Sequence, residues 1–281
     1  MTVTKQVEII IDGRKIRVPQ GTTILKAAAM LEIRIPTLCH HEELSPSGSC
    51  RLCIVEISNP SQNPDRSWID SACVCPASEG LNIKTHSPRV LKERKLIIEL
   101  LLSRAPDSQQ IMKLALENGI TKPRFTAADE GKSNCILCGL CMRVCNELIK
   151  AEAIGFSGRG IKKEVVSPFK IAGDLCIGCK ACEAVCPTGV INFKIENKKL
   201  RKQDWGVALE MIFCPDCGQP VGTSVQMEQL KEKITITDEL LSCCPACRRK
   251  KNYSVRTVLH RTAKGLSDVS DYNRLTSKET G

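Results

Sequence analysis

The sequence is poor in aromatic residues and has no long apolar run. Nine of its 281 residues are aromatic (five Phe, two Trp and two Tyr), so any core is aliphatic and divided into small pieces. No apolar run approaches the roughly 18 residues that a membrane-spanning helix needs, so we expect no membrane span. The N-terminal residues contain neither an apolar signal core nor twin arginines, and we therefore expect a cytoplasmic protein.

Motifs that bind nucleotides or carry out hydrolysis are also missing. No G-x-G-x-x-G pattern follows a predicted strand, and neither a Walker motif nor a convincing hydrolytic triad occurs. These absences exclude a motif-defined dinucleotide-binding domain, a P-loop ATPase and the common hydrolases. The chain offers no visible site at which a substrate bond would be made or broken.

Cysteine, by contrast, is abundant. The chain has 18 cysteines, which is several times the usual share but less than the density of a small disulfide-rich domain. Disulfides are rare in a reducing compartment, so metal binding is the leading explanation for so many thiols. The spacing of the cysteines then indicates which metals.

The strongest pattern is a Cys-x2-Cys-x2-Cys-x3-Cys run that occurs twice. In two-cluster ferredoxins the fourth cysteine of each run ligates the cluster of the other run. Glycines beside these cysteines, Gly139 and Gly178, are expected to let the backbone approach the sulfurs closely. The pattern therefore predicts one [4Fe–4S] cluster on Cys135, Cys138, Cys141 and Cys186, and a second on Cys145, Cys176, Cys179 and Cys182.

A second group of cysteines lies near the N-terminus. A [2Fe–2S] cluster needs four thiolates, and a long loop followed by a Cys-x2-Cys pair suits it. Here Cys39 precedes the pair Cys50 and Cys53, and the fourth ligand is Cys73 or Cys75.

The third group consists of two Cys-x2-Cys knuckles near the C-terminus. Two such knuckles hold one tetrahedral ion, which we expect to be structural zinc because four sulfurs leave no open position. The knuckles also resemble those of rubredoxin, in which mononuclear iron takes the site. The predicted ligands are Cys214, Cys217, Cys244 and Cys247, with Cys243 as the alternative to Cys244.

Local patterns predict the elements that carry these cysteines. Asp12-Gly13 is a strong hairpin turn signal between two β-rich runs, and Thr23 is placed to cap a helix after it. The stretch 58–67, rich in Asn, Pro and Ser, predicts a surface loop.

A helical connector without cysteines is predicted from Pro88. Val90, Leu91 and Ile98 belong to its apolar stripe, whereas Arg94 falls mainly on another face. Pro106 is expected to end this helix, and Asp107 to cap a second one.

These signals predict an α+β chain with several domains. We expect a β-grasp [2Fe–2S] domain, the helical connector, a ferredoxin-like domain with two [4Fe–4S] clusters, a zinc-ribbon-like module and a basic tail. Their predicted boundaries are 1–87, 88–128, 129–200, 205–250 and 251–281.

Five sequence segments resemble a known family. The segments resemble the N-terminal electron-transfer region of the large iron–sulfur subunit of NADH dehydrogenase. The same module occurs in iron-only hydrogenases and in the small diaphorase-side subunit of NAD-reducing nickel–iron hydrogenases. The segments are PTLCHH (36–41), SGSCRLCIVE (47–56), ACVCPASEG (72–80), CGLCMRVCNE (138–147) and AIGFSGRG (153–160).

The resemblance refines the expected cofactors. In the family the fourth [2Fe–2S] ligand stands in a Cys-x2-Pro context, which selects Cys73 over Cys75. Relatives often bind a further [4Fe–4S] cluster through one histidine and three cysteines after the connector, but no cysteine occurs here between Cys75 and Cys135. We therefore expect three iron–sulfur clusters and one zinc.

The resemblance also implies a role and partners. It implies a non-catalytic relay of single electrons between a flavin- and NAD(P)-binding subunit and a hydrogenase catalytic subunit, with ferredoxin as a further partner. A formate dehydrogenase catalytic subunit is the alternative, and a stand-alone carrier is another.

Net charge bears on a different class of function. The chain has 41 basic and 31 acidic residues, a formal charge of +10, and the residues after Cys247 are strongly basic. This composition raises the alternative of a redox- or iron-sensing nucleic-acid binder. However, each four-thiolate site carries about −2 when oxidised, so four sites lower the total to about +2. We therefore expect no nucleic-acid partner.

Overall fold

The computed structural model describes residues 5–125, 134–168, 175–233 and 238–251. The chain divides into two compact units. The larger unit comprises residues 1–176, 180–194 and 202–207, and the smaller comprises residues 177–179, 195–201 and 208–281. Apart from residue 251, the predicted basic tail lies outside the described residues.

The larger unit begins with the predicted hairpin. Strands β1 (Gln6–Ile11) and β2 (Arg14–Pro19) pair antiparallel. Asp12 and Gly13 join them with φ angles of 48° and 81°, the left-handed conformation that a two-residue hairpin turn requires. The hairpin prediction is confirmed.

Helix α1 (Ile24–Met30) follows the hairpin, also as predicted. The Thr23 hydroxyl caps it by accepting a hydrogen bond from the Lys26 amide at 3.3 Å. Ile24 and Ala28 are fully buried, one helical turn apart, so this face of the helix packs into the core.

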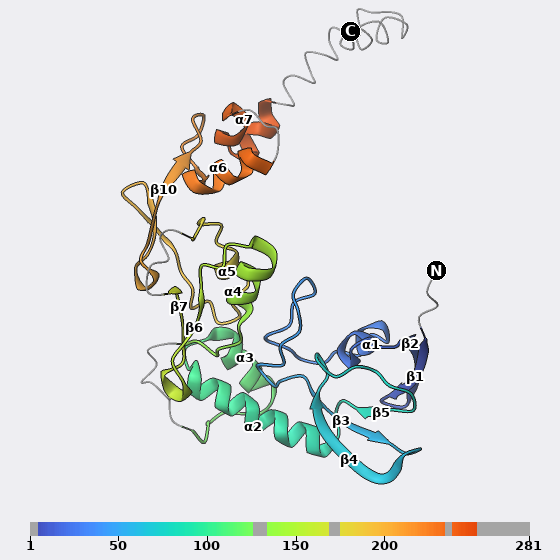
Figure 1. The fold of residues 1–281 in the computed structure, drawn as a ribbon. Helices are drawn as coiled ribbons and strands as arrows, with labels where there is room; N and C mark the ends of the chain where they lie inside the picture. Colours follow the sequence, from blue (N-terminus) through green and yellow to red (C-terminus); the bar gives the residue numbers. More distant parts are fainter. Residues whose placement is uncertain (1–4, 126–133, 169–174, 234–237, 252–281) are drawn as a thin grey trace, which may run out of the picture. The chain divides into compact units, whose positions relative to one another are not determined.

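Three more strands complete a five-stranded sheet (Figure 1). They are β3 (Ile54–Asn59), β4 (Asn63–Ser71) and β5 (Asn82–Lys84), and the strand order is β2-β1-β5-β3-β4. β1 and β5 run parallel, whereas the other neighbours are antiparallel. The core against this sheet is aliphatic, as the shortage of aromatic residues predicts; it includes Val7, Ile9, Ile11, Val18, Ile24, Ala28, Val55, Ile57 and Ile83.

The prediction of a loop over residues 58–67 is wrong. β3 and β4 form a hairpin whose turn occupies only the residues between Asn59 and Asn63, and Ser58 pairs with Ser67 across it. Asn and Pro disfavour strands on average. Here cross-strand pairing overrides that preference, and β4 is an edge strand, where a proline does not interrupt the ladder.

The connector consists of two helices, α2 (Pro88–Arg104) and α3 (Gln109–Glu117). The first ends just before Pro106, as predicted. The cap predicted for the second is wrong, because Ser108 and not Asp107 occupies the N-cap position. Asp107 is engaged elsewhere: its amide donates to Asn134 Oδ1 at 3.1 Å, and its carboxylate accepts from Asn134 Nδ2 at 2.9 Å.

The faces of α2 also differ from the prediction. Val90 and Ile98 are fully buried, as expected, but Leu91 is 46% exposed and Arg94 only 3% exposed. The helix therefore directs a guanidinium into the protein and a leucine outward. An arginine is buried only where its donors find acceptors, and here they do so in the N-terminal domain.

The two cysteine runs share one backbone plan. In the first run Leu137 and Gly139 have φ angles of 53° and 73°, and in the second run Gly178 and Lys180, at the corresponding positions, have 70° and 60°. A short helix starts directly after each pair: α4 (Leu140–Arg143) and α5 (Ala181–Ala184). The repeat seen in the cysteine spacing is thus a repeat of structure.

The remaining elements of the larger unit surround the cysteine runs. α4 continues into the π-helix η1 (Val144–Ile149). A small antiparallel hairpin and two 3-10 turns follow: β6 (Gly155–Ser157), η2 (Gly160–Lys162), β7 (Glu164–Val166) and η5 (Gln203–Trp205).

The second sheet has the strand order β11-β10-β9-β8 and belongs mainly to the smaller unit. Its strands are β8 (Lys194–Glu196), β9 (Lys199–Lys202), β10 (Val207–Phe213) and β11 (Pro220–Thr223). Helices α6 (Ser224–Lys233) and α7 (Asp238–Ser242) follow. Among the described residues, no helix combines the length and the apolar character needed to cross a bilayer.

Gly178 packs against this sheet. A Cβ atom at Gly178 would lie 2.5 Å from Thr223 Cγ2, 3.0 Å from Leu200 Cδ2 and 3.1 Å from Leu209 Cδ1. Thr223 is fully buried, and its hydroxyl donates to the carbonyl of Ile177. The absence of a side chain at Gly178 therefore makes room for side chains of the sheet, a role that the prediction of close backbone–sulfur approach did not include.

We predict that Gly178→Ala is more damaging than Gly189→Ala. Both glycines have positive φ, 70° and 66°, so both substitutions introduce about 1–2 kcal/mol of backbone strain. Only at position 178 does the new methyl also clash with buried atoms, which adds about 1–3 kcal/mol. Denaturant unfolding and iron content per chain measure the difference. Equal losses in the two variants would contradict the packing role.

Candidate metal centres

The N-terminal cysteines converge at one end of the β3–β4 hairpin. Cys53 directly precedes β3 and Cys73 lies two residues beyond β4, and the Ala72 amide donates to the Cys53 carbonyl at 3.0 Å. Cys39 and Cys50 come from the segment between α1 and β3. All four are at most 3% exposed.

The four thiols also shift one another's pKa values through hydrogen bonds and charge. The Cys50 amide lies 3.4 Å from Cys39 Sγ. A hydrogen bond between these two thiols lowers the pKa of Cys39 and raises that of Cys50, and the same arrangement lowers the pKa of Cys73 and raises that of Cys53. The Cys39 charge acts on Cys53 and Cys73 as well. The structure thus brings together an all-thiol donor set of the kind that a [2Fe–2S] cluster requires.

Cys75 stands apart from this set. Its sulfur lies 3.9 Å from the Pro76 carbonyl oxygen, and its side chain packs against the aliphatic core. Burial, together with the charge of Asp70, raises its pKa to about 11. The structure places Cys73, and not Cys75, beside Cys53.

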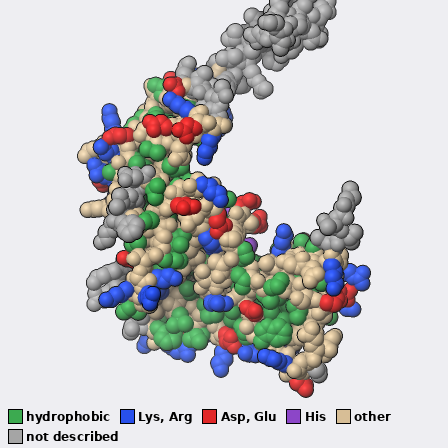
Figure 2. Space-filling view, viewed as in Figure 1, with side chains coloured by type: hydrophobic (Ala, Val, Ile, Leu, Met, Phe, Trp, Pro, Cys, Tyr) green, Lys and Arg blue, Asp and Glu red, His purple; other side chains and the backbone are tan. Residues whose placement is uncertain are grey.

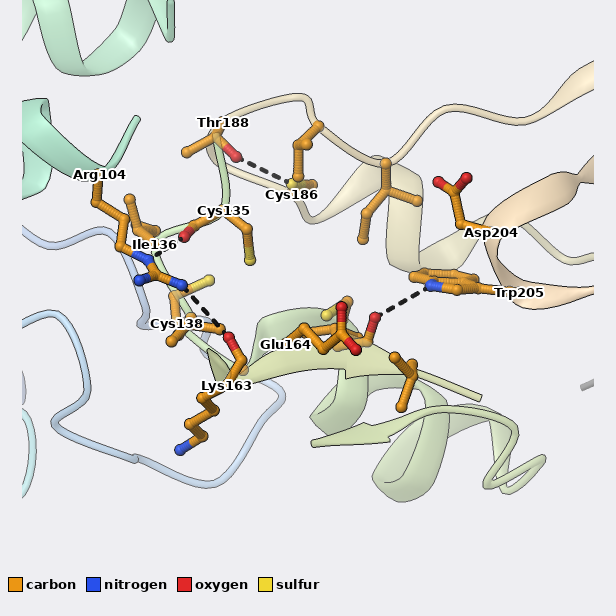
Figure 3. Close-up of a pocket in the computed structure, with 17 residues that line it drawn as sticks. Arg104, Cys135, Ile136, Cys138, Lys163, Glu164, Cys186, Thr188, Asp204 and Trp205 are labelled. Carbon is orange, nitrogen blue, oxygen red and sulfur yellow. Dashed lines mark hydrogen bonds between the residues drawn. The ribbon is translucent and has the colours of Figure 1, made fainter. Parts of the chain in front are cut away.

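The four cysteines predicted for the first [4Fe–4S] cluster line a single cavity of about 300 Å³ (Figure 3). Cys135 and Cys138 come from the coiled segment before α4, Cys141 lies in α4 itself, and the fourth, Cys186, follows α5. The set is Cys135, Cys138, Cys141 and Cys186. A tight loop with three thiolates and one remote thiolate suits the corners of a cubane.

Burial governs the electrostatics of this cavity. It raises the pKa of Cys138 to about 11 and that of Cys141 to about 12, and the neighbouring thiolates act in the same direction. Backbone amides oppose the effect, with Leu137 donating towards Cys135 and Leu140 towards Cys138. The positive charge of an iron centre would stabilise these thiolates, which burial otherwise disfavours.

The cavity walls include residues that the sequence patterns did not single out. The Arg104 guanidinium donates to the Cys135 carbonyl at 3.0 Å and to the Lys163 carbonyl at 3.3 Å. Trp205 Nε1 donates to the Val165 carbonyl at 3.2 Å and so holds the β6–β7 hairpin (Figure 3). No motif marks these residues, because their partners are backbone carbonyls far away in the sequence.

The cysteines predicted for the second [4Fe–4S] cluster are distributed over both units. Cys145, Cys176 and Cys182 belong to the larger unit, and Cys179 to the smaller. α4 and α5 contact each other, and the charge of Cys182 acts on Cys141. The two runs therefore meet within the larger unit.

The loop with Cys39 sits directly on the helix that carries Cys141 and Cys145. Arg143 donates to the carbonyls of Cys39, at 2.6 Å, and Ser45. Glu147 accepts from the Ser45 amide at 2.8 Å and from its hydroxyl at 2.6 Å.

A continuous buried core lies beneath this contact. It contains Cys39, Cys50 and Cys138 together with aliphatic residues of the loop, of α2 and α3 and of α4. The charge of Cys39 is close enough to help raise the pKa of Cys138. The candidate [2Fe–2S] and first [4Fe–4S] sites are therefore neighbours within one unit.

The C-terminal knuckles also meet, within the smaller unit. The first knuckle turns between β10 and β11, and the second begins after α7 and runs into a helical segment at 245–251. The second half of the site is thus helical and not a second β-hairpin. The sulfurs of Cys214, Cys217, Cys244 and Cys247 all lie within 4.8 Å of one another.

Cys243 lies next to this group. Its thiol donates to Asp216 Oδ2 at 3.4 Å, and Lys251 contacts the same carboxylate oxygen at 2.9 Å. Cys243 and Asp216 form a second possible donor set with Cys214. Only the set with Cys244 is composed entirely of sulfur, which is the donor that soft metal sites prefer.

Comparison with known proteins identifies two of these modules. Residues 4–88 match the 2Fe-2S iron-sulfur cluster binding domain, and residues 134–190 match the 4Fe-4S dicluster domain. Both contain the corresponding cysteine groups.

The chain is similar to subunits of several redox enzymes. It is 32% identical to the NADPH-Fe(3+) oxidoreductase subunit alpha of Geobacter sulfurreducens, with 75% of this chain and 26% of that protein aligned. It is 32% identical to the NADP-reducing hydrogenase subunit HndD of Solidesulfovibrio fructosivorans, with 65% of this chain and 35% of that protein aligned. It is 28% identical to the mitochondrial NADH dehydrogenase (ubiquinone) iron-sulfur protein 1 of Solanum tuberosum, with 69% of this chain and 29% of that protein aligned.

A solved structure agrees with these relatives. A chain from the NAD+-reducing [NiFe]-hydrogenase in the H2-reduced state superposes with a TM-score of 0.56 at 26% identity, covering 72% of this chain and 94% of that one. This chain spans only 26–35% of the length of the curated relatives named above. The resemblance inferred from the cysteine motifs is confirmed.

We predict that Arg143→Met loosens the loop between Cys39 and Cys50. The variant removes a charged donor from two carbonyls, and such hydrogen bonds contribute about 1.5–3 kcal/mol each. Hydrogen exchange of the loop amides should accelerate at least about tenfold. Glu147→Gln, which keeps an acceptor, should have a smaller effect.

Lys113→Met on α3 serves as the control, because Lys113 is exposed and pairs with Glu117 at 4.0 Å on the surface. Unchanged exchange of the loop in Arg143→Met would show that this contact does not hold it.

Proposed function

We propose, from the iron–sulfur module that this chain shares with NADH dehydrogenase and NAD(P)-reducing hydrogenases, that it relays single electrons within a multisubunit NAD(P)-linked oxidoreductase. The observation that carries the proposal is the common core of Cys39, Cys50 and Cys138. Electron transfer between clusters needs close approach, and this shared core supports it.

The relay would use three clusters. The [2Fe–2S] cluster would be held by Cys39, Cys50, Cys53 and Cys73. The first [4Fe–4S] cluster would be held by Cys135, Cys138, Cys141 and Cys186, and the second by Cys145, Cys176, Cys179 and Cys182. Contact between α4 and α5 supports a path that continues from the first to the second.

The partners follow from the chemistry of a one-electron path. A nicotinamide gives or takes two electrons as a hydride, and an iron–sulfur cluster carries one at a time. A flavin-binding subunit must therefore divide the pair. At the other end we propose a hydrogenase catalytic subunit, because two of the relatives are hydrogenase proteins by name. A formate dehydrogenase unit would use the same path, and ferredoxin is a further partner.

The connector offers a surface for such a partner. Apolar side chains are exposed along α2 and α3 (Figure 2). They are Leu91 (46%), Leu96 (38%), Leu100 (48%), Met112 (39%) and Leu116 (67%). Contiguous exposed apolar side chains are typical of protein interfaces.

The relay proposal predicts how the protein is loaded and reduced. The purified chain should contain about ten iron atoms (two, four and four). Dithionite should reduce its clusters, whereas NADPH or NADH should do so only when a flavoprotein subunit co-purifies, because an iron–sulfur cluster accepts single electrons and not a hydride. Absorbance and EPR spectra measure both. Rapid reduction of the isolated chain by a nicotinamide, or about 14 irons, would contradict the proposal.

For the C-terminal site we propose one structural zinc on Cys214, Cys217, Cys244 and Cys247, with mononuclear iron as the alternative. Cys244→Ser should lower bound zinc from about one per chain to near zero and destabilise the smaller unit. Cys243→Ser should retain the zinc, because Cys243 bonds to Asp216. Elemental analysis of the two variants separates the ligands, and zinc loss from Cys243→Ser alone would reverse the assignment.

A further inference from the structure

Arg94 is a buried arginine on α2 that reaches into the N-terminal domain. It is 3% exposed, and its guanidinium donates to three backbone carbonyls. Nε donates to Leu52 at 3.2 Å, and Nη2 donates to Ile54 at 2.8 Å and Thr85 at 3.2 Å. A planar guanidinium with several acceptors is held in one orientation.

The acceptors lie beside a candidate cluster ligand. Leu52 and Ile54 are the two neighbours of Cys53, so Arg94 binds the backbone on both sides of that cysteine. The third acceptor, Thr85, is itself fixed, because its amide donates to Asp12 Oδ1 at 2.8 Å. The charge therefore has a fixed place near the [2Fe–2S] site.

Arg94 has no carboxylate to balance it. Among the residues that the structure describes, no Asp or Glu lies within salt-bridge distance of Arg94, and Glu99, a buried carboxylate on the same helix, pairs with Arg124. Burial lowers the pKa of Arg94, and the charge of Cys53 opposes this shift. Carbonyls can bind a guanidinium but cannot neutralise it, so the thiolates of the candidate cluster are its countercharge.

We infer that Arg94 is a positioning residue for the [2Fe–2S] cluster whose buried positive charge raises the reduction potential of that cluster. This inference rests on the ligand set Cys39, Cys50, Cys53 and Cys73 of the proposed function.

The direction of the change in reduction potential follows from the charges of the cluster and of Arg94. An oxidised [2Fe–2S] core with four thiolates carries about −2, and one electron takes it to −3. A fixed cation nearby attracts the reduced form more strongly than the oxidised form. Removing the cation therefore makes the cluster harder to reduce, and its potential becomes more negative.

The test separates the charge from the hydrogen bonds. Arg94→Gln keeps amide donors but has no charge, whereas Arg94→Lys keeps the charge but not the planar fork. Arg89→Met is the matched control, since Arg89 lies on the same helix, 49% exposed and paired with Glu93. Each full-length holoprotein is titrated with dithionite, which donates the electron, and the [2Fe–2S] EPR signal is followed against potential.

Arg94→Gln should lower the equilibrium constant for reduction at least about tenfold, which corresponds to about 59 mV for one electron. Arg94→Lys should stay near the wild-type potential, and Arg89→Met should match it. The [4Fe–4S] potentials should change less than that of [2Fe–2S] in every variant.

Three outcomes would overturn the inference. One is an unchanged potential in Arg94→Gln with the cluster fully loaded. Another is an equal shift of the reduction potential in Arg94→Lys and Arg94→Gln. The third is loss of the cluster from both variants. Either of these two results would mean that Arg94 only supports the backbone. Absence of a [2Fe–2S] signal from the wild-type protein would instead refute the proposed function.

Discussion

The seating of the loop 39–50 on the α4–η1 helix is the contact on which the rest of the larger unit depends. Arg143 and Glu147 hold this loop by its backbone and by Ser45. Both residues come from the segment that also carries Cys141 and Cys145. Because the segment α4–η1 carries candidate ligands and also contacts the neighbouring candidate site, this contact and the core beneath it hold the two candidate sites next to each other.

Several arginines donate hydrogen bonds to backbone carbonyls at or beside the cysteines. Arg143 donates to the Cys39 carbonyl, Arg104 to that of Cys135 and Arg248 to that of Cys243, and Arg94 binds the carbonyls on both sides of Cys53. A guanidinium can bind a carbonyl with a fork of donors and remain charged when partly buried. Four of the basic residues are thus placed beside the cysteines of the candidate metal centres.

Local signals in the sequence were sufficient for several features. Asp12-Gly13 predicts its hairpin because few other dipeptides tolerate that turn, and the doubled cysteine spacing predicts the repeat and the cavity shared by Cys135 and Cys186. The prediction failed where distant partners decide the outcome. The strand β4 forms because β3 pairs with it, and Arg94 is buried because carbonyls 40 and 42 residues away accept its hydrogen bonds. Helical periodicity, which treats every arginine as polar, contains no information about such acceptors.

The contact between α4–η1 and the loop 39–50 also links the two cysteine groups mechanically. Arg143 and Glu147 alternate along the chain with Cys141 and Cys145, so the geometry of the contact depends on how the chain around those cysteines is coiled. A change in the coil of one cysteine group therefore changes the surface on which the loop of the other group rests.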